Sequence, residues 1–225
     1  LQYGVVGGMP AVVNEFSNTK MINNVQHMLR DIVNGYRDDM IKYASTGDKA
    51  RIRECFDSIP KQLGKENKKF QYSIIKKKGT ASMYAGSLQW IEDAGIINRC
   101  YNLSITELPL DGNAIEGIFK VYMADIGLFI SMLEDGTGYD ILNGSLLGYK
   151  GAIYENIIAD MLVKEGYSLY FYKNEKGTIE MDFLVRDKDS LVPIEVKAID
   201  GSTISLNNLI DKKNIELKII SDLNN

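Results

Sequence analysis

Polar and apolar residues alternate along two neighbouring stretches late in the chain, residues 177–185 and 191–199. Alternation with period 2 is typical of a β-strand that buries one face. The intervening residues 186–190 are mostly polar and are predicted to form a turn. The pattern therefore predicts a β-hairpin.

The same alternation decides which side chains share a face of this hairpin. On the first strand Asp182 lies with Glu180 and Leu184, and on the second strand Glu195 lies with Lys197. If the two polar faces coincide, we expect Asp182, Glu195 and Lys197 to converge on one point.

Helical spacing dominates the first half of the chain and returns before the hairpin. Apolar residues three and four positions apart predict helices over residues 21–34, 36–43, 48–59, 80–95 and 150–165. We expect Gly35 to end the first of these helices and the third to stop before Pro60. A short helix is predicted over 125–133, a loop over 136–148, and strands over 96–103, 120–123 and 167–172. In the tail, a short helix at 206–211 and a last strand at 216–220 are predicted.

The order of helices and strands between residues 48 and 123 is that of a winged-helix module. In such a module the longest helix can lie in a DNA major groove. Lys76, Lys77 and Lys78 stand directly before this helix, in the most basic region of the chain, and are therefore the candidate DNA contacts. In the alternative interpretation the fold packs against a partner domain and the lysines are solvated.

The composition limits the function classes. A net charge of -4 gives no overall attraction to nucleic acid, so any DNA contact requires a local basic patch. Cys55, Cys100 and His27 have no spacing that suits a zinc site, and unpaired thiols indicate a reducing, cytoplasmic location. The longest apolar stretch, residues 121–133, is too short to span a bilayer, so no membrane partner is expected. The oligomeric state does not follow from these properties.

A chain of 225 residues accommodates one large domain or two modest ones. We expect an α+β protein, with α/β character in the second half. Residues 1–115 would form a helical, winged-helix-like domain, and residues 116–225 a sheet with flanking helices. The boundary is placed where the composition changes, between Gly112 and Gly117.

The hairpin carboxylates suggest phosphodiester chemistry. Magnesium prefers carboxylate, phosphate and water oxygens, so Asp182 and Glu195 are candidate metal ligands. Glu155, predicted at the edge of the buried face of its helix, would complete the metal shell. Lys197 would orient the attacking water or stabilise charge on the phosphate, as catalytic lysines do. In the alternative, these residues form solvated cross-strand pairs worth roughly 0.2–1 kcal/mol each.

These residues resemble the PD-(D/E)XK, or restriction-endonuclease-like, signature: Glu155, Asp182 and Glu195-Val196-Lys197. The resemblance extends to Gly7-Gly8-Met9-Pro10, to residues 119–128 and to residues 151–156. Together these motifs are similar to the C-terminal region of a bacterial and archaeal family of AAA-type P-loop ATPases. That region is a domain of unknown function.

The resemblance implies that an ATPase domain precedes Leu1 in the intact protein. The sequence has no G-x-x-x-x-G-K-[ST] loop, so ATP would be bound only by that preceding domain. Two features depart from the family: no lysine-rich run follows Lys197, and the chain ends soon after Ile220, which would leave the last strand and helix absent or shortened. We therefore carry two hypotheses, a magnesium-dependent nuclease module and a non-catalytic DNA-binding or protein-interaction module that serves the ATPase.

Overall fold

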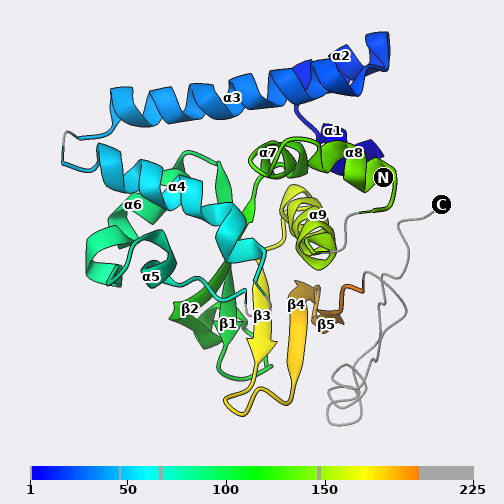
Figure 1. Ribbon diagram of the computed structural model, residues 1–225. Coiled ribbons are helices and arrows are strands. Elements are labelled where there is room, and N and C mark those ends of the chain that lie inside the picture. The colour runs from blue at the N-terminus through cyan, green and yellow to red at the C-terminus, as the bar shows by residue number, and fades with distance from the viewer. Residues whose placement is uncertain (1, 46, 66–67, 146–147, 198–225) are drawn as a thin grey trace.

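The computed structural model describes residues 2–45, 47–65, 68–145 and 148–197, in which helices come first and a sheet follows (Figure 1). The helices are α1 (Gln2–Val6), α2 (Pro10–Thr19), α3 (Ile22–Tyr43), α4 (Lys49–Leu63), α5 (Tyr72–Ile75), α6 (Ala81–Asp93), α7 (Ile126–Ser131), α8 (Thr137–Leu142) and α9 (Lys150–Lys164). The strands are β1 (Ile97–Leu103), β2 (Ala114–Met123), β3 (Tyr170–Lys173), β4 (Glu180–Asp187) and β5 (Ser190–Ile194). The fold is α+β, as the sequence predicted. None of the helices in these segments is long and apolar enough to cross a membrane.

The strands form one sheet in the order β2-β1-β3-β4-β5. All neighbours are antiparallel except β1 and β3, which are parallel. The predicted hairpin is confirmed, with Phe183 of β4 opposite Ile194 of β5. In Figure 1, α9 lies between α7 and the strands, so one helix contacts both the helical layer and the sheet.

The boundary expected between residues 115 and 116 falls inside β2. Strands from both sides of it share the sheet, and one cluster of buried apolar residues extends from Val5 to Ile194. The change in composition near Gly112 marks the short connection between β1 and β2 rather than a linker, because a 3-10 turn at Asp111–Asn113 precedes β2 directly. Among the described residues, strands from both sides of the expected boundary thus share one sheet, and a second, smaller apolar cluster is formed by Leu103, Leu110, Met181 and Leu184. The division into two domains stays a prediction.

Two helices continue past the residues expected to end them. α3 passes through Gly35 as one helix of 22 residues, and its buried residues follow a helical spacing on both sides of the glycine: Val25, Leu29, Val33 and Met40. α4 includes Pro60 and buries Leu63 beyond it. Packing of the apolar face outweighs the local cost of glycine and proline at these positions.

Most of the remaining helices and strands form near their predicted positions. α6, α7, α9, β1, β2 and β3 form where helices and strands were expected, with ends that differ by a few residues and a longer β2. α8 forms inside the predicted loop 136–148. The helix at 206–211 and the strand at 216–220 lie outside the described residues.

The Gly-Gly-Met-Pro turn contacts the start of α7. Asp125 caps α7 by accepting a hydrogen bond from the Leu128 N–H (3.0 Å), and it accepts a second from the Gly8 N–H (2.6 Å). Gly7 has a positive φ of 71°, and a Cβ there would lie 2.3 Å from an Asp125 carboxylate oxygen. This turn therefore requires glycine.

Candidate functional site

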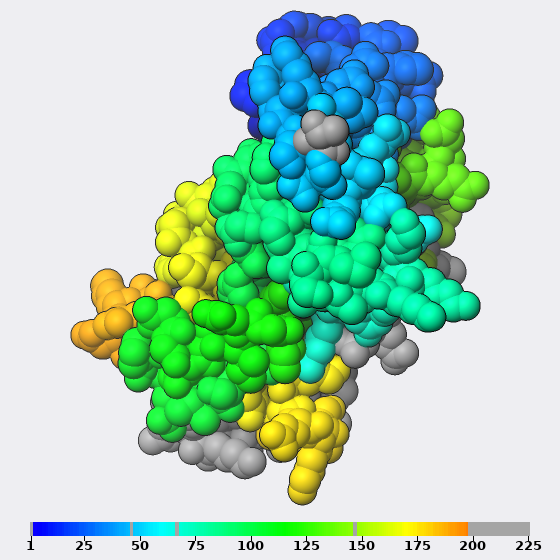
Figure 2. Space-filling view, turned by 90° about the vertical axis from the view of Figure 1, so that its left-hand side faces the viewer, coloured from blue at the N-terminus to red at the C-terminus, as the bar shows by residue number. Residues whose placement is uncertain are grey.

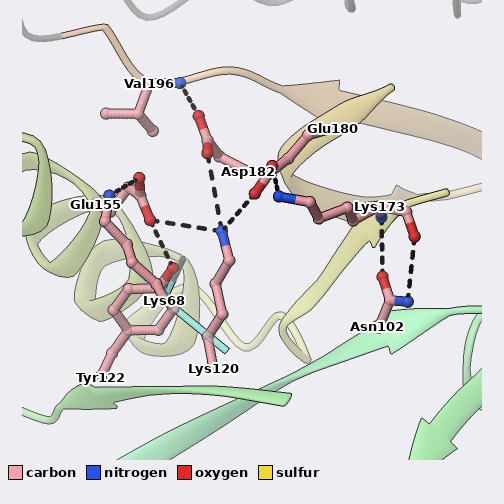
Figure 3. Close-up of polar contacts among 9 residues, drawn as sticks. All are labelled: Lys68, Asn102, Lys120, Tyr122, Glu155, Lys173, Glu180, Asp182 and Val196. Atoms are coloured by element: carbon pink, nitrogen blue, oxygen red, sulfur yellow. Dashed lines mark hydrogen bonds and ion pairs between the residues drawn. The ribbon is translucent and has the colours of Figure 1, made fainter. Parts of the chain in front are cut away.

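Lys120 of β2 lies at the centre of a group of buried charges. Its side chain is 2% exposed, and its ammonium lies 3.7 Å from Glu155 Oε2, 3.9 Å from Asp182 Oδ1 and 3.7 Å from Glu180 Oε1. Figure 3 shows these three carboxylates approaching the ammonium from different directions. The ammonium also lies 4.9 Å from the centre of the Phe171 ring, a favourable cation–π distance.

The sequence interpretation did not select Lys120, although β2 carries a signal. Lys120 and Tyr122 alternate with Phe119, Val121 and Met123, so both polar side chains share one face of a mostly apolar strand. A lysine in such a strand is unusual because lysine is rarely buried without a partner. The sequence pattern assigns residues 120–123 to the strand pair of a winged-helix module and gives Lys120 no role.

Glu155 is positioned by its neighbour Asn156, which docks α9 on β2. The Asn156 side chain accepts a hydrogen bond from the Met123 N–H (2.8 Å) and donates one to the Met123 carbonyl (2.9 Å), as a neighbouring strand would. Glu155 is therefore buried, at 5% exposure, and not at the edge of the helix face as predicted. Its Oε2 accepts a hydrogen bond from the Tyr122 hydroxyl (2.9 Å).

A second lysine reaches Glu155 from the segment between α4 and α5. Lys68 forms a hydrogen-bonded ion pair with Glu155 Oε1, so each oxygen of this carboxylate faces an ammonium or a hydroxyl. The Lys68 ammonium also lies near Gly151 at the start of α9. No local sequence pattern predicts this contact, because Lys68 stands in a basic stretch typical of a solvated surface.

Asp182 of β4 is held by the backbone of the next strand. Its Oδ2 accepts a hydrogen bond from the Val196 N–H (2.8 Å). The expected face of β4 holds for Glu180 and Asp182, which both lie near Lys120, but not for Leu184, which packs with Met181. The reason is a register shift: Tyr170 pairs with Leu184 and Tyr172 with Met181, so β4 has one extra residue, as in a β-bulge.

The charges shift the pKa values of this group in different directions. Burial raises the pKa of Glu155, but the ammonium ions of Lys120 and Lys68 outweigh burial and leave it below its ordinary value. Burial and the charge of Glu155 raise the pKa of Asp182 to about 6. Burial lowers the pKa of Lys120, yet Glu155 and Asp182 hold it above its ordinary value. Lys120 is therefore a permanent cation at neutral pH.

Glu195 and Lys197 pair with each other. The two side chains form a close ion pair, and neither makes a hydrogen bond or ion pair with Glu155 or Asp182. Glu195 is 6% exposed, and its Oε2 has no hydrogen-bond partner in the part of the chain that the structure describes. Across the same residues, no group of three or more His, Cys, Asp and Glu side chains is arranged to hold a metal ion. The expected ligand shell of Glu155, Asp182 and Glu195 is thus not assembled around one point.

The candidate DNA contacts are far more exposed than these residues. Lys76, Lys77 and Lys78 lie in the connection between α5 and α6, and all three are exposed. Lys76 forms an ion pair with Glu54 of α4 at 3.3 Å. The helical order and the β1–β2 hairpin agree with the predicted order of elements, and the winged-helix assignment stays a prediction.

Comparison with protein families divides the chain into two segments. Residues 1–138 match a family described as Domain of unknown function (DUF8612), which is more than half of the 225 residues. The chain belongs to the DUF8612 family. Residues 150–221 match a second family described as Domain of unknown function (DUF4143). Neither the curated proteins nor the solved structures gave a match.

The charged group lies across these two segments. The DUF8612 segment contributes the cations Lys68 and Lys120 together with Tyr122, and the DUF4143 segment contributes Glu155 and Asp182. β1 of the first segment also pairs with β3 of the second. The site is therefore complete only when both segments are present.

Proposed function

We propose that this chain is a non-catalytic, nuclease-like interaction module that serves an AAA-type ATPase. One observation carries the proposal: the ammonium of Lys120 lies 3.7–3.9 Å from Glu155, Asp182 and Glu180, where a catalytic cation would be expected. The lysine supplies the positive charge that a metal ion would supply in a nuclease, but it brings no metal-bound water.

The described residues do not fit magnesium at this position. Magnesium requires near-octahedral oxygen ligation at about 2.0–2.1 Å and keeps several waters. An ammonium at the centre of the carboxylates leaves no space for such an ion, and Glu155 is also paired with Lys68. A metal would have to displace the buried Lys120 side chain and the partly buried Lys68 side chain.

Coupling to an ATPase is supported by the sequence resemblance to the C-terminal region of AAA-type ATPases. DUF4143 segments are generally associated with AAA-type ATPase neighbours. One sheet and one large apolar cluster join residues from both matched segments, so an ATPase domain could act on them together. We therefore infer a role in transmitting or sensing the state of that ATPase.

A magnesium-dependent nuclease is the second candidate function, and one observation favours it. Glu195 Oε2 is buried without a partner among the described residues, and a cation would relieve its desolvation. Glu195 also belongs to the Glu-x-Lys pair of the nuclease-like signature.

Cleavage assays separate the two candidates. The chain and its Lys197→Ala variant are incubated with single- and double-stranded DNA in magnesium or manganese, with the expected ATPase domain also supplied. We expect equal, background levels of product from both proteins and a midpoint of thermal unfolding that 10 mM magnesium leaves unchanged relative to the same ionic strength of sodium. Cleavage that depends on both the metal and Lys197 would overturn the non-catalytic proposal.

A further inference from the structure

The acidic chain contains a strongly basic segment. Residues 49–78 hold ten Lys and Arg residues against three Asp and Glu residues, a net charge of +7 in a chain of net charge -4. This segment includes α4, α5 and the connection to α6. A local positive field can therefore exist on a molecule that is negative overall.

Two of the three carboxylates in this segment, Glu54 and Asp57, are already paired. Glu54 accepts a hydrogen bond from the Tyr84 hydroxyl (2.6 Å) and pairs with Lys76, and Asp57 pairs with Arg37 (2.9 Å) and Arg53 (3.6 Å). Lys61, Lys77 and Lys78 are exposed and make no ion pair with any residue that the structure describes.

One of these lysines, Lys61, lines a groove. A groove of about 400 Å³ separates α4 from α5, and Arg53 and Lys61 line one side while Ile74 and Ile75 line the other. Lys76, Lys77 and Lys78 follow Ile75 directly in the chain. In Figure 2 the teal segment around these residues stands out on the molecular surface.

A tight turn fixes the lysine loop. The Gly79 N–H donates to the Lys76 carbonyl (2.7 Å), and Lys78 adopts a positive φ of 68°. A Cβ at Gly79 would lie 2.3 Å from the Tyr72 carbonyl oxygen, so this turn leaves no space for a larger residue. Lys77 and Lys78 are thus presented from a defined backbone conformation.

We propose that this basic surface, formed by Lys61, Lys77 and Lys78, binds the phosphate backbone of duplex DNA.

The size and exposed residues of α6, the helix that follows Lys78, favour duplex DNA over duplex RNA as the ligand. α6 has 13 residues and spans about 20 Å. Its first turns expose the small residues Ala81, Ser82, Ala85 and Gly86, together with Gln89 and Met83, which is 41% exposed. The DNA major groove is about 12 Å wide and admits a helix, whereas that of A-form RNA is narrow and deep.

The test is a salt titration of DNA binding. Fluorescence anisotropy with a labelled 20-base-pair duplex is measured for the whole chain and for the double variant Lys77→Gln/Lys78→Gln at several sodium chloride concentrations. Loss of two phosphate contacts should make the slope of log affinity against log salt shallower by about 1.8 and weaken binding at ~0.1 M salt on the order of tenfold or more.

A matched control separates local contact from net charge. Lys42→Gln/Lys176→Gln removes two exposed lysines elsewhere, in α3 and in the β3–β4 turn, and changes the net charge equally. We expect this control to keep the slope of the unmodified chain. Equal slopes for all three proteins, or no binding to duplex DNA at all, would overturn the proposal.

Competition identifies the nucleic acid. Unlabelled duplex DNA of the same sequence should displace the probe at lower concentration than single-stranded DNA or duplex RNA does. Stronger displacement by RNA contradicts the assignment to DNA. The site around Lys120 is not involved, so a failed titration leaves the non-catalytic proposal standing, and metal-dependent cleavage leaves this surface standing.

Discussion

Lys120 is a buried ammonium whose stability depends on three carboxylates. Removing an ammonium from water costs several kcal/mol, and the cost is recovered only when charges of opposite sign surround it. Its counter-charges come from α9 and β4, and Tyr122 and Lys68 hold Glu155 in place. The position of this one side chain therefore depends on elements far apart in the sequence.

Substitution of Lys120 by methionine should be strongly destabilising. Lys120→Met leaves Glu155 and Asp182 buried with one fewer cation, and we expect the free energy of unfolding to fall by roughly 3–5 kcal/mol. Lys173→Met is the matched control, because its partner Glu180 is 37% exposed, and it should cost less than about 1 kcal/mol. Urea denaturation at pH 7 measures both, and similar losses would show that Lys120 is not a central counter-ion.

At the residue scale, the sequence pattern identifies the carboxylates of the site but not the lysines that pair with them. Glu155 and Asp182 stood out as charges among apolar residues, and the structure brings both to Lys120. Lys120 carries the same signal, but the sequence pattern predicts its strand only as the partner of residues 96–103 and does not place it beside β4. Residue pattern reports which faces are apolar, whereas the parallel pairing of β1 with β3 is a long-range contact that no local pattern encodes.

At the scale of elements, two glycines differ in whether their position requires glycine. Gly35 lies within α3 with open space where a Cβ would be, so its flexibility only weakens the helix. Gly7 has a positive φ and is packed against Asp125 and the Gly127 backbone, so it has no substitute. The predicted helix end at Gly35 is wrong because packing of the apolar face of α3 is not visible in local sequence signals.

Alanine at these positions should change stability in opposite directions. Gly35→Ala is expected to raise the free energy of unfolding by about 0.5–1 kcal/mol. Gly7→Ala should lower it by more than that amount, because both the backbone conformation and the Cβ position are unfavourable. Thermal unfolding followed by circular dichroism measures both. A stabilising Gly7→Ala would mean that the contact with Asp125 is not formed.

At the scale of the whole molecule, the two matched segments share one sheet, and we expect them to fold as a single unit. β2 and β1 of the DUF8612 segment end the sheet that β3, β4 and β5 of the DUF4143 segment continue. Asn156 of the DUF4143 segment forms hydrogen bonds with the backbone N–H and carbonyl of Met123 in the DUF8612 segment. The α+β class was predictable from element order, but the single sheet was not.

A fragment that ends at residue 138 should therefore fail to fold cooperatively. It keeps Lys120 but loses Glu155, Asp182 and the β3 edge, so a buried charge and a strand become exposed. We expect residues 1–138 to give a broad thermal transition and poorly dispersed amide resonances, compared with a sharp transition for the full chain. A sharp transition in the fragment would contradict the single folding unit.

The position of Lys120 also limits how these two segments can be exchanged between related proteins. Its charge belongs to one segment and its counter-charges to the other. A chimera that joins this DUF4143 segment to a partner without the lysine would bury two acids with no central cation. Such a chimera would need a compensating change of acid to amide in the same step. The charges around Lys120 therefore restrict which DUF8612 segment can be joined to this DUF4143 segment without burying unpaired acids.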